Sequence, residues 1–150
     1  MQVKISTTLS CPPERAWQEI QQVKLLLHIA RPLVVFEPIQ PNTFPATWGN
    51  EKYLVRMRLF GFLPLGKQWI VITLDDVKCE LLDDGHSVII KQWRHRITVE
   101  PTPEGCTRYT DTVDIEAGLL TFGVWLFANV FFRHRQNRWR KLVNRNFIYM

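Results

Sequence analysis

Apolar and polar residues alternate along several short segments of the chain, which is the period of strands that bury one face. At the start, Val3, Ile5, Thr7 and Leu9 alternate with more polar neighbours. Similar patterns predict further strands over residues 33–37, 53–59, 69–74, 79–82, 88–99 and 107–117. Together these segments indicate a sheet of about six to seven strands.

Turn-forming residues separate the predicted strands. The pair Asp84-Gly85 predicts a two-residue hairpin between residues 79–82 and 88–99, and residues 101–105 predict a second hairpin. Residues 38–49 contain three prolines and are expected to form an irregular turn, and residues 61–66 a loop between two glycines. Because hairpins join neighbouring strands, the sheet is expected to be antiparallel.

Two short helices are predicted after the first strand. Pro13 suits the first position of a helix, and Ala16, Trp17, Ile20 and Val23 follow the three-four spacing of one apolar face. A second helix is predicted over residues 25–30. It should end at Arg31-Pro32, because a residue that precedes proline avoids helical angles.

The longest predicted element is a helix from Leu119 to about Phe147, which the chain enters through Gly118. Its first half, residues 119–132, is nearly all apolar, yet it is shorter than the roughly 17–25 apolar residues of a membrane span. A helix with apolar residues on every face must be buried by other parts of the protein over most of its surface. The chain is therefore expected to adopt an α+β architecture in which a strongly bent antiparallel sheet wraps around this helix.

Charge is concentrated at the end of the chain. The net charge is +5, but residues 133–145 hold six of the 19 basic residues and no acidic one, which leaves 13 basic and 14 acidic residues elsewhere. Cys11, Cys79 and Cys106 are widely spaced and odd in number, so free thiols in a reducing compartment are expected. The first residues contain no hydrophobic signal core, and a cytoplasmic location is expected.

Four segments carry a resemblance to a known family. They are Cys11-Pro-Pro-Glu-Arg-Ala-Trp17, Ala30-Arg-Pro-Leu-Val-Val-Phe-Glu-Pro38, Trp93-Arg-His-Arg-Ile-Thr-Val-Glu-Pro101 and Tyr109-Thr-Asp-Thr-Val-Asp-Ile-Glu-Ala-Gly118. In these segments, and in its order of elements, the chain resembles the START-like, or SRPBCC, helix-grip superfamily, which includes the birch-pollen allergen group, polyketide cyclase-like proteins and lipid-transfer domains. The resemblance implies one ligand-binding domain over residues 1–150, with a deep, mainly apolar cavity between helix and sheet.

The last hairpin supplies the best candidates for polar anchors. If its turn is centred near Pro103, antiparallel pairing places His95 opposite Asp111, on the more apolar face of the sheet. A buried His–Asp pair can orient a bound ligand, and it can also hold an imidazole as a general base. The alternative is a pair with a purely structural role.

The expected function is binding of a hydrophobic or amphipathic small molecule, such as a lipid or a polyketide-like compound, without a cofactor. The residues expected to contact it are Tyr53, Met57, Trp93, His95, Ile97, Tyr109, Asp111, Val113, Phe127 and Phe131. The first alternative is a cyclase- or dehydratase-type enzyme that uses His95 as general base. The second is a protein-interaction module that uses residues 62–65 or the basic helix end.

Other site classes fit the sequence less well. Gly61, Gly66 and Lys67 match a phosphate-binding P-loop, but Gln68 replaces its Ser/Thr and a strand follows where that motif needs a helix. The four histidines fall on different elements, and no cysteine spacing resembles a zinc site, so no metal is expected. The basic end of the helix permits contact with an anionic membrane surface. Its apolar residues recur every three or four positions, which favours a helix packed against the protein over a nucleic-acid site.

Overall fold

The computed structural model describes residues 1–149. Strand β1 (Gln2–Leu9) leads into helices α1 (Pro13–Ile20) and α2 (Val23–Ala30). Six further strands follow: β2 (Val34–Gln40), β3 (Lys52–Leu59), β4 (Leu63–Asp75), β5 (Glu80–Gly85), β6 (Gln92–Pro101) and β7 (Thr107–Glu116). A 3-10 turn, η1 (Gly118–Leu120), opens the last helix, α3 (Thr121–Asn144).

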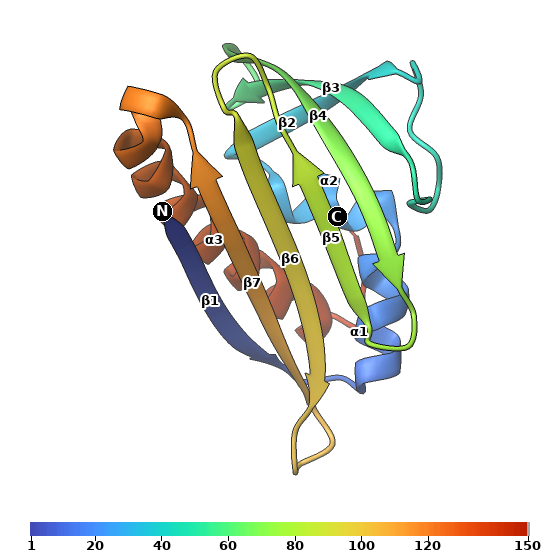
Figure 1. Cartoon of the computed structure of the whole chain (residues 1–150). Helices are drawn as coiled ribbons and strands as arrows, with labels where there is room; N and C mark the ends of the chain where they lie inside the picture. The colour runs from blue at the N-terminus through green and yellow to red at the C-terminus, as the bar shows by residue number, and fades with distance from the viewer. Residues whose placement is uncertain (150) are drawn as a thin grey trace.

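All seven strands form one antiparallel sheet in the order β1-β7-β6-β5-β4-β3-β2. Helix α3 lies behind β1, β7 and β6 in Figure 1, and the sheet bends so that β2 and β3 stand away from those strands. α3 packs against β1, β7 and α2. The predicted α+β helix-grip architecture is confirmed, and its concave face is the side on which α3 lies.

The start and end of the short helices follow the predicted signals. Pro13 is the first residue of α1, and Ala16, Trp17, Ile20 and Val23 are all buried. Val23 does not continue α1 as predicted, because it is the first residue of α2, which begins two residues before the predicted start. Arg31, directly after α2, has the extended backbone (φ −70°, ψ 152°) that the following proline favours. Gly118 has φ +57° at the entry to the last helix, in the left-handed region that glycine adopts most readily.

The hairpin predicted between β5 and β6 is confirmed, since these two strands pair, but its turn does not lie at Asp84-Gly85. Both residues belong to β5, and residues 86–91 make the connection to β6. Glycine is needed at position 85 for a different reason: a Cβ there would lie 2.9 Å from the backbone oxygen of Trp69. The next residue, His86, exchanges two backbone hydrogen bonds with Trp69, so β4 and this segment approach closely.

The loop predicted over residues 61–66 is also largely wrong, because β4 already begins at Leu63. The pairing of β3 with β4 shifts between Met57 and Arg58, which marks a β-bulge. Gly66, with φ +89°, lies opposite Met57 at this bulge. A strand continues through the segment, so the partial P-loop match has neither the loop nor the helix that phosphate binding requires.

The remaining boundary errors are small. β2 extends through Pro38 to Gln40 where a turn was expected, and α3 ends at Asn144, three residues before the predicted Phe147. The 3-10 turn takes the place of the first predicted helical residues.

The second half of α3 packs as its spacing predicts. Phe132, Gln136, Trp139 and Val143 are buried, and Trp139 is fully enclosed near Tyr109 and Phe147. The basic stretch thus has an apolar face directed into the protein.

Replacing Trp139 with alanine is expected to lower the free energy of unfolding by about 3–5 kcal/mol, since it leaves a large cavity in the core. Chemical denaturation followed by circular dichroism measures this loss. Lys141→Ala, on the exposed face of the same helix, is the control and should stay within about 0.5 kcal/mol of the wild type. Equal losses in the two variants would contradict this account of the helix packing.

Candidate ligand-binding site

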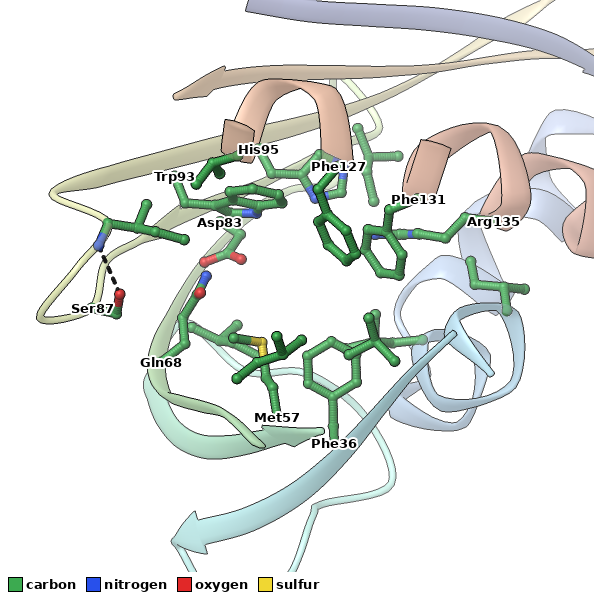
Figure 2. A pocket seen from close by; sticks show the side chains of 18 of the residues that line it. Phe36, Met57, Gln68, Asp83, Ser87, Trp93, His95, Phe127, Phe131 and Arg135 are labelled. Carbon is green, nitrogen blue, oxygen red and sulfur yellow. Dashed lines mark hydrogen bonds between the residues drawn. The ribbon is translucent and has the colours of Figure 1, made fainter. Parts of the chain in front are cut away.

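A cavity of about 420 Å³ lies between α3 and the concave face of the sheet. Figure 2 shows Phe36 and Met57 on one side, Trp93 and His95 on another, and Phe127 on α3, all directed toward one space. Most lining residues are aliphatic or aromatic; Gln68, Asp83, Ser87, His95 and Arg135 are among the few polar ones. This volume, and a wall that is mainly apolar with a few polar groups, are typical of a small-molecule binding site.

Exposed lining residues show where the cavity opens. Leu65 of β4, Ile89 of the β5–β6 connection and Leu120 of η1 are 39%, 58% and 55% exposed. The mouth therefore lies between the β3–β4 hairpin, the β5–β6 connection and the start of α3. The neighbouring side chains Phe62 and Leu63 are exposed as well. A role for residues 62–65 in covering the mouth or contacting a partner stays a prediction.

Seven of the ten residues predicted to contact a ligand lie on the cavity wall. They are Met57, Trp93, His95, Ile97, Tyr109, Phe127 and Phe131. Tyr53, Asp111 and Val113 are buried outside the lining: Tyr53 packs against Trp48 and accepts a hydrogen bond from the backbone N–H of Gly49. That any of these residues contacts a ligand stays a prediction.

The register predicted for the β6–β7 hairpin is wrong by two residues. His95 lies opposite Val113, and Asp111 lies opposite Ile97, because the turn is centred on residue 104 instead of residue 103. A shift of two residues leaves each side chain on the same face, since the side-chain period of a strand is two. His95 and Asp111 are therefore diagonal neighbours, and their side chains still meet.

Asp111 is the centre of a buried polar network. Its Oδ1 lies 2.7 Å from His95 Nε2 and accepts a hydrogen bond from the Tyr109 hydroxyl at 3.0 Å. Its Oδ2 accepts a hydrogen bond from Gln136 Nε2 at 3.0 Å, and the same amide donates to the backbone oxygen of Ile5 at 2.7 Å. The network joins β1, β6, β7 and α3.

Burial and hydrogen bonding together set the charges in this network. Burial lowers the pKa of His95 more than Asp111 raises it, so the imidazole is neutral at pH 7. Burial alone would raise the pKa of Asp111, but the His95 hydrogen bond, the charge of Arg135 and the Gln136 hydrogen bond outweigh it and hold that pKa low. The carboxylate can only accept, so His95 Nε2 carries the proton and Nδ1 is left with a lone pair.

Four polar residues on the cavity wall were not predicted from the sequence: Gln68, Asp83, Ser87 and Arg135. Asp83 is buried on β5, and its Oδ1 accepts a hydrogen bond from the backbone N–H of Val71 at 2.9 Å. Figure 2 shows the polar ends of Gln68 and Asp83 pointing toward each other on the same part of the cavity wall. Burial raises the pKa of Asp83 from 3.8 to about 7.

The basic stretch of α3 divides between surface and interior. Arg133 and Arg140 are exposed, whereas Arg138 donates to the backbone oxygen of His28 and Arg135 is only 6% exposed. Spacing carried a signal for Arg135, which lies four residues from both Phe131 and Trp139 and so shares their buried face.

Residues 7–143 match the family described as a domain of unknown function, DUF8410. The chain belongs to this family. A comparison with curated proteins finds no match.

Solved structures show the fold type. The chain aligns with the protein TTHA0849 from Thermus thermophilus (16% identity, TM-score 0.70, 97% of this chain and 99% of that one). It also aligns with a START superfamily protein from Mycobacterium smegmatis (9%, 0.62, 96% and 97%) and with the Zhui aromatase/cyclase from Streptomyces sp. R1128 (14%, 0.65, 95% and 90%). The resemblance to START/SRPBCC proteins is confirmed at the level of the fold.

The structure bears on two further site classes. Over residues 1–149, no three or more His, Cys, Asp or Glu side chains gather in a way that could hold a metal ion. None of the helices in this range combines the length and the apolar character that a membrane span needs.

Replacing Asp83 with asparagine is expected to stabilise the protein at pH 8 and to matter much less at pH 4. The pKa of Asp83 is about 7 in the folded state and 3.8 in the reference state, so the wild type loses stability as the pH rises from about 4 to about 7. Asparagine stays neutral and can still accept from Val71. The expected gain in unfolding free energy at pH 8 is on the order of 2–4 kcal/mol.

Denaturant titrations at both pH values measure this difference. Asp84→Asn is the matched control, since Asp84 is the exposed neighbour on the same strand and should show little pH-dependent gain. A gain for Asp83→Asn that is the same at pH 4 and pH 8 would contradict the assignment.

Proposed function

We propose that this protein binds a hydrophobic or amphipathic small molecule in the cavity between α3 and the sheet. The observation that carries the proposal is the cavity of about 420 Å³, whose wall is mainly apolar and opens to the surface near Leu120. A wall of this composition favours an apolar ligand, and the few polar groups would fix its orientation. Binding within this cavity is compatible with either transport or sensing.

Hydrophobic burial would supply most of the affinity. At about 25 cal/mol per Å², covering 200 Å² of apolar ligand surface contributes roughly 5 kcal/mol before the cost of association. A polar group on the ligand would have to find a partner on the wall, because an unpaired polar group in an apolar site weakens binding.

N-phenyl-1-naphthylamine, an uncharged apolar probe, is expected to bind with an increase and a blue shift of its fluorescence. Met57→Trp should lower its affinity at least fivefold, because Met57 lines the cavity and a larger side chain takes up its space. Fluorescence titration of the probe into each variant measures the effect.

The matched control is Arg56→Trp, which adds the same side chain at the neighbouring position of β3, outside the lining. It should bind the probe like the wild type. The proposal fails if the wild type does not bind the probe, or if both variants bind it as the wild type does. Native mass spectrometry of freshly purified protein provides a second test by detecting a co-purified small molecule.

A second candidate function is supported by the state of His95. This residue is neutral, lies on the cavity wall and donates from Nε2 to an ionised Asp111. An imidazole held in this way has a lone pair on Nδ1 that can accept a proton from a bound molecule. The candidate reaction is abstraction of a proton next to a carbonyl group, as a cyclase- or dehydratase-type enzyme would require.

The ketone 2-tetralone in deuterated buffer tests this candidate. An enzyme of this type should speed exchange of the protons next to the carbonyl, measured by NMR, and His95→Asn should lower the rate at least a hundredfold while probe binding persists. Exchange at the same rate in both proteins would remove the enzymatic candidate and leave the binding proposal intact.

A further inference from the structure

Arg135 is a buried cation on the cavity wall. Arg135 is 6% exposed. Its guanidinium carbon lies 5.0 Å from the ring centroid of Phe132 and 5.7 Å from that of Phe131. Its Nε is enclosed and has no hydrogen-bond partner among residues 1–149. No carboxylate in this range forms an ion pair with it. Figure 2 shows Arg135 reaching from α3 toward the cavity beside Phe131.

The polar groups near Arg135 are engaged elsewhere. Asp111 uses both carboxylate oxygens within its own network, and Asp83 accepts from the backbone of Val71. The hydroxyl of Tyr109 is neutral, since burial raises its pKa more than the nearby Arg135 guanidinium lowers it, and it donates to Asp111. Aromatic rings cover the face of a guanidinium, but they offer nothing to the N–H groups in its plane. Because a buried charge with few hydrogen-bond partners is costly, a further acceptor at the cavity wall would stabilise Arg135.

We propose that the ligand of this cavity is an amphiphile with a single acidic group, of the size of a carboxylate, which accepts hydrogen bonds from Arg135. This inference rests on the proposed binding function and specifies the chemical class of the ligand. The apolar body would lie along α3 toward the mouth. Gly123, at the wall near the mouth, is twelve residues from Arg135, and a helix rises 1.5 Å per residue, so about 18 Å separate them along the helix axis.

The charges on the wall favour a monoanion over a dianion. Arg135 is the one Lys or Arg side chain among the described lining residues, and His95 is neutral. Asp83, whose pKa is about 7, is largely ionised at pH 7.5 and adds negative charge to the wall, which opposes a second negative charge on the ligand. A dianionic phosphate would leave one negative charge buried without compensation, whereas a carboxylate matches one guanidinium in charge and can bond to it in a bidentate manner.

The test compares cis-parinaric acid with its methyl ester, two fluorescent probes that share one hydrocarbon chain and differ in the acidic group. At pH 7.5 the wild type is expected to bind the acid at least tenfold more tightly than the ester. Arg135→Met keeps an apolar stem without the charge, so it should weaken binding of the acid at least tenfold and leave the ester within twofold.

Arg133→Met is the matched control, because Arg133 lies two residues away on the exposed face of the same helix. It should change neither affinity. The proposal is overturned if the wild type binds acid and ester equally, or if a folded Arg135→Met variant weakens both equally. The wild-type comparison requires no variant, so it decides the question even if Arg135→Met does not fold.

Binding of N-phenyl-1-naphthylamine separates the two proposals. If the protein binds this uncharged probe but binds the acid and the ester with equal affinity, only the proposal of an acidic group on the ligand is refuted. If neither the uncharged probe nor either form of parinaric acid binds, the binding function fails together with it.

Discussion

The carboxylate of Asp111 connects the sheet to the last helix. It lies on β7, accepts from His95 of β6 and from Gln136 of α3, and through Gln136 it is linked to the backbone of β1. An ionised carboxylate in the interior is tolerated only when its oxygens are satisfied, so these donors must keep their positions. The network therefore fixes both the depth and the rotation of α3 against the sheet.

That constraint also determines what faces the cavity. Arg135 precedes Gln136 on α3, and Phe131 and Phe132 lie one turn earlier, so the rotation that brings Gln136 to Asp111 also directs Arg135 and Phe131 to the cavity wall. On the other side, the hydrogen bond to Asp111 holds the imidazole of His95. A structural network and a candidate site thus share residues, and a change in one is expected to alter the other.

Sequence patterns sufficed for the architecture because burial demands are strong and periodic. Alternation identified the strands, three-four spacing identified the helices, and an apolar helix that needed cover indicated the bent sheet. The pairing of His95 with Asp111 survived an error in register because the error was two residues, which preserves the face of every side chain.

The polar residues of the wall were missed for local reasons. Reading Asp84-Gly85 as a turn ended the predicted strand at residue 82, although Leu81, Asp83 and Gly85 continue its inward face. Close approach to Trp69 explains Gly85, and such a tertiary contact has no signature in the sequence. Arg135 was grouped with the other basic residues of the helix. Only its four-residue spacing from Phe131 and Trp139 indicates that it lies on the buried face.

The position of the opening has a consequence for selectivity. Leu65, Ile89 and Leu120 border the surface, whereas Arg135 lies about three helical turns deeper than Gly123. A molecule whose polar group binds at Arg135 would place the end of its apolar chain at the mouth of the cavity. Additional methylene groups would then extend into solvent or along exposed side chains. In the proposed binding mode the protein would recognise the polar group of its ligand and would not select for the length of the apolar chain. Compounds that share one polar group and differ in chain length would then form a series of ligands.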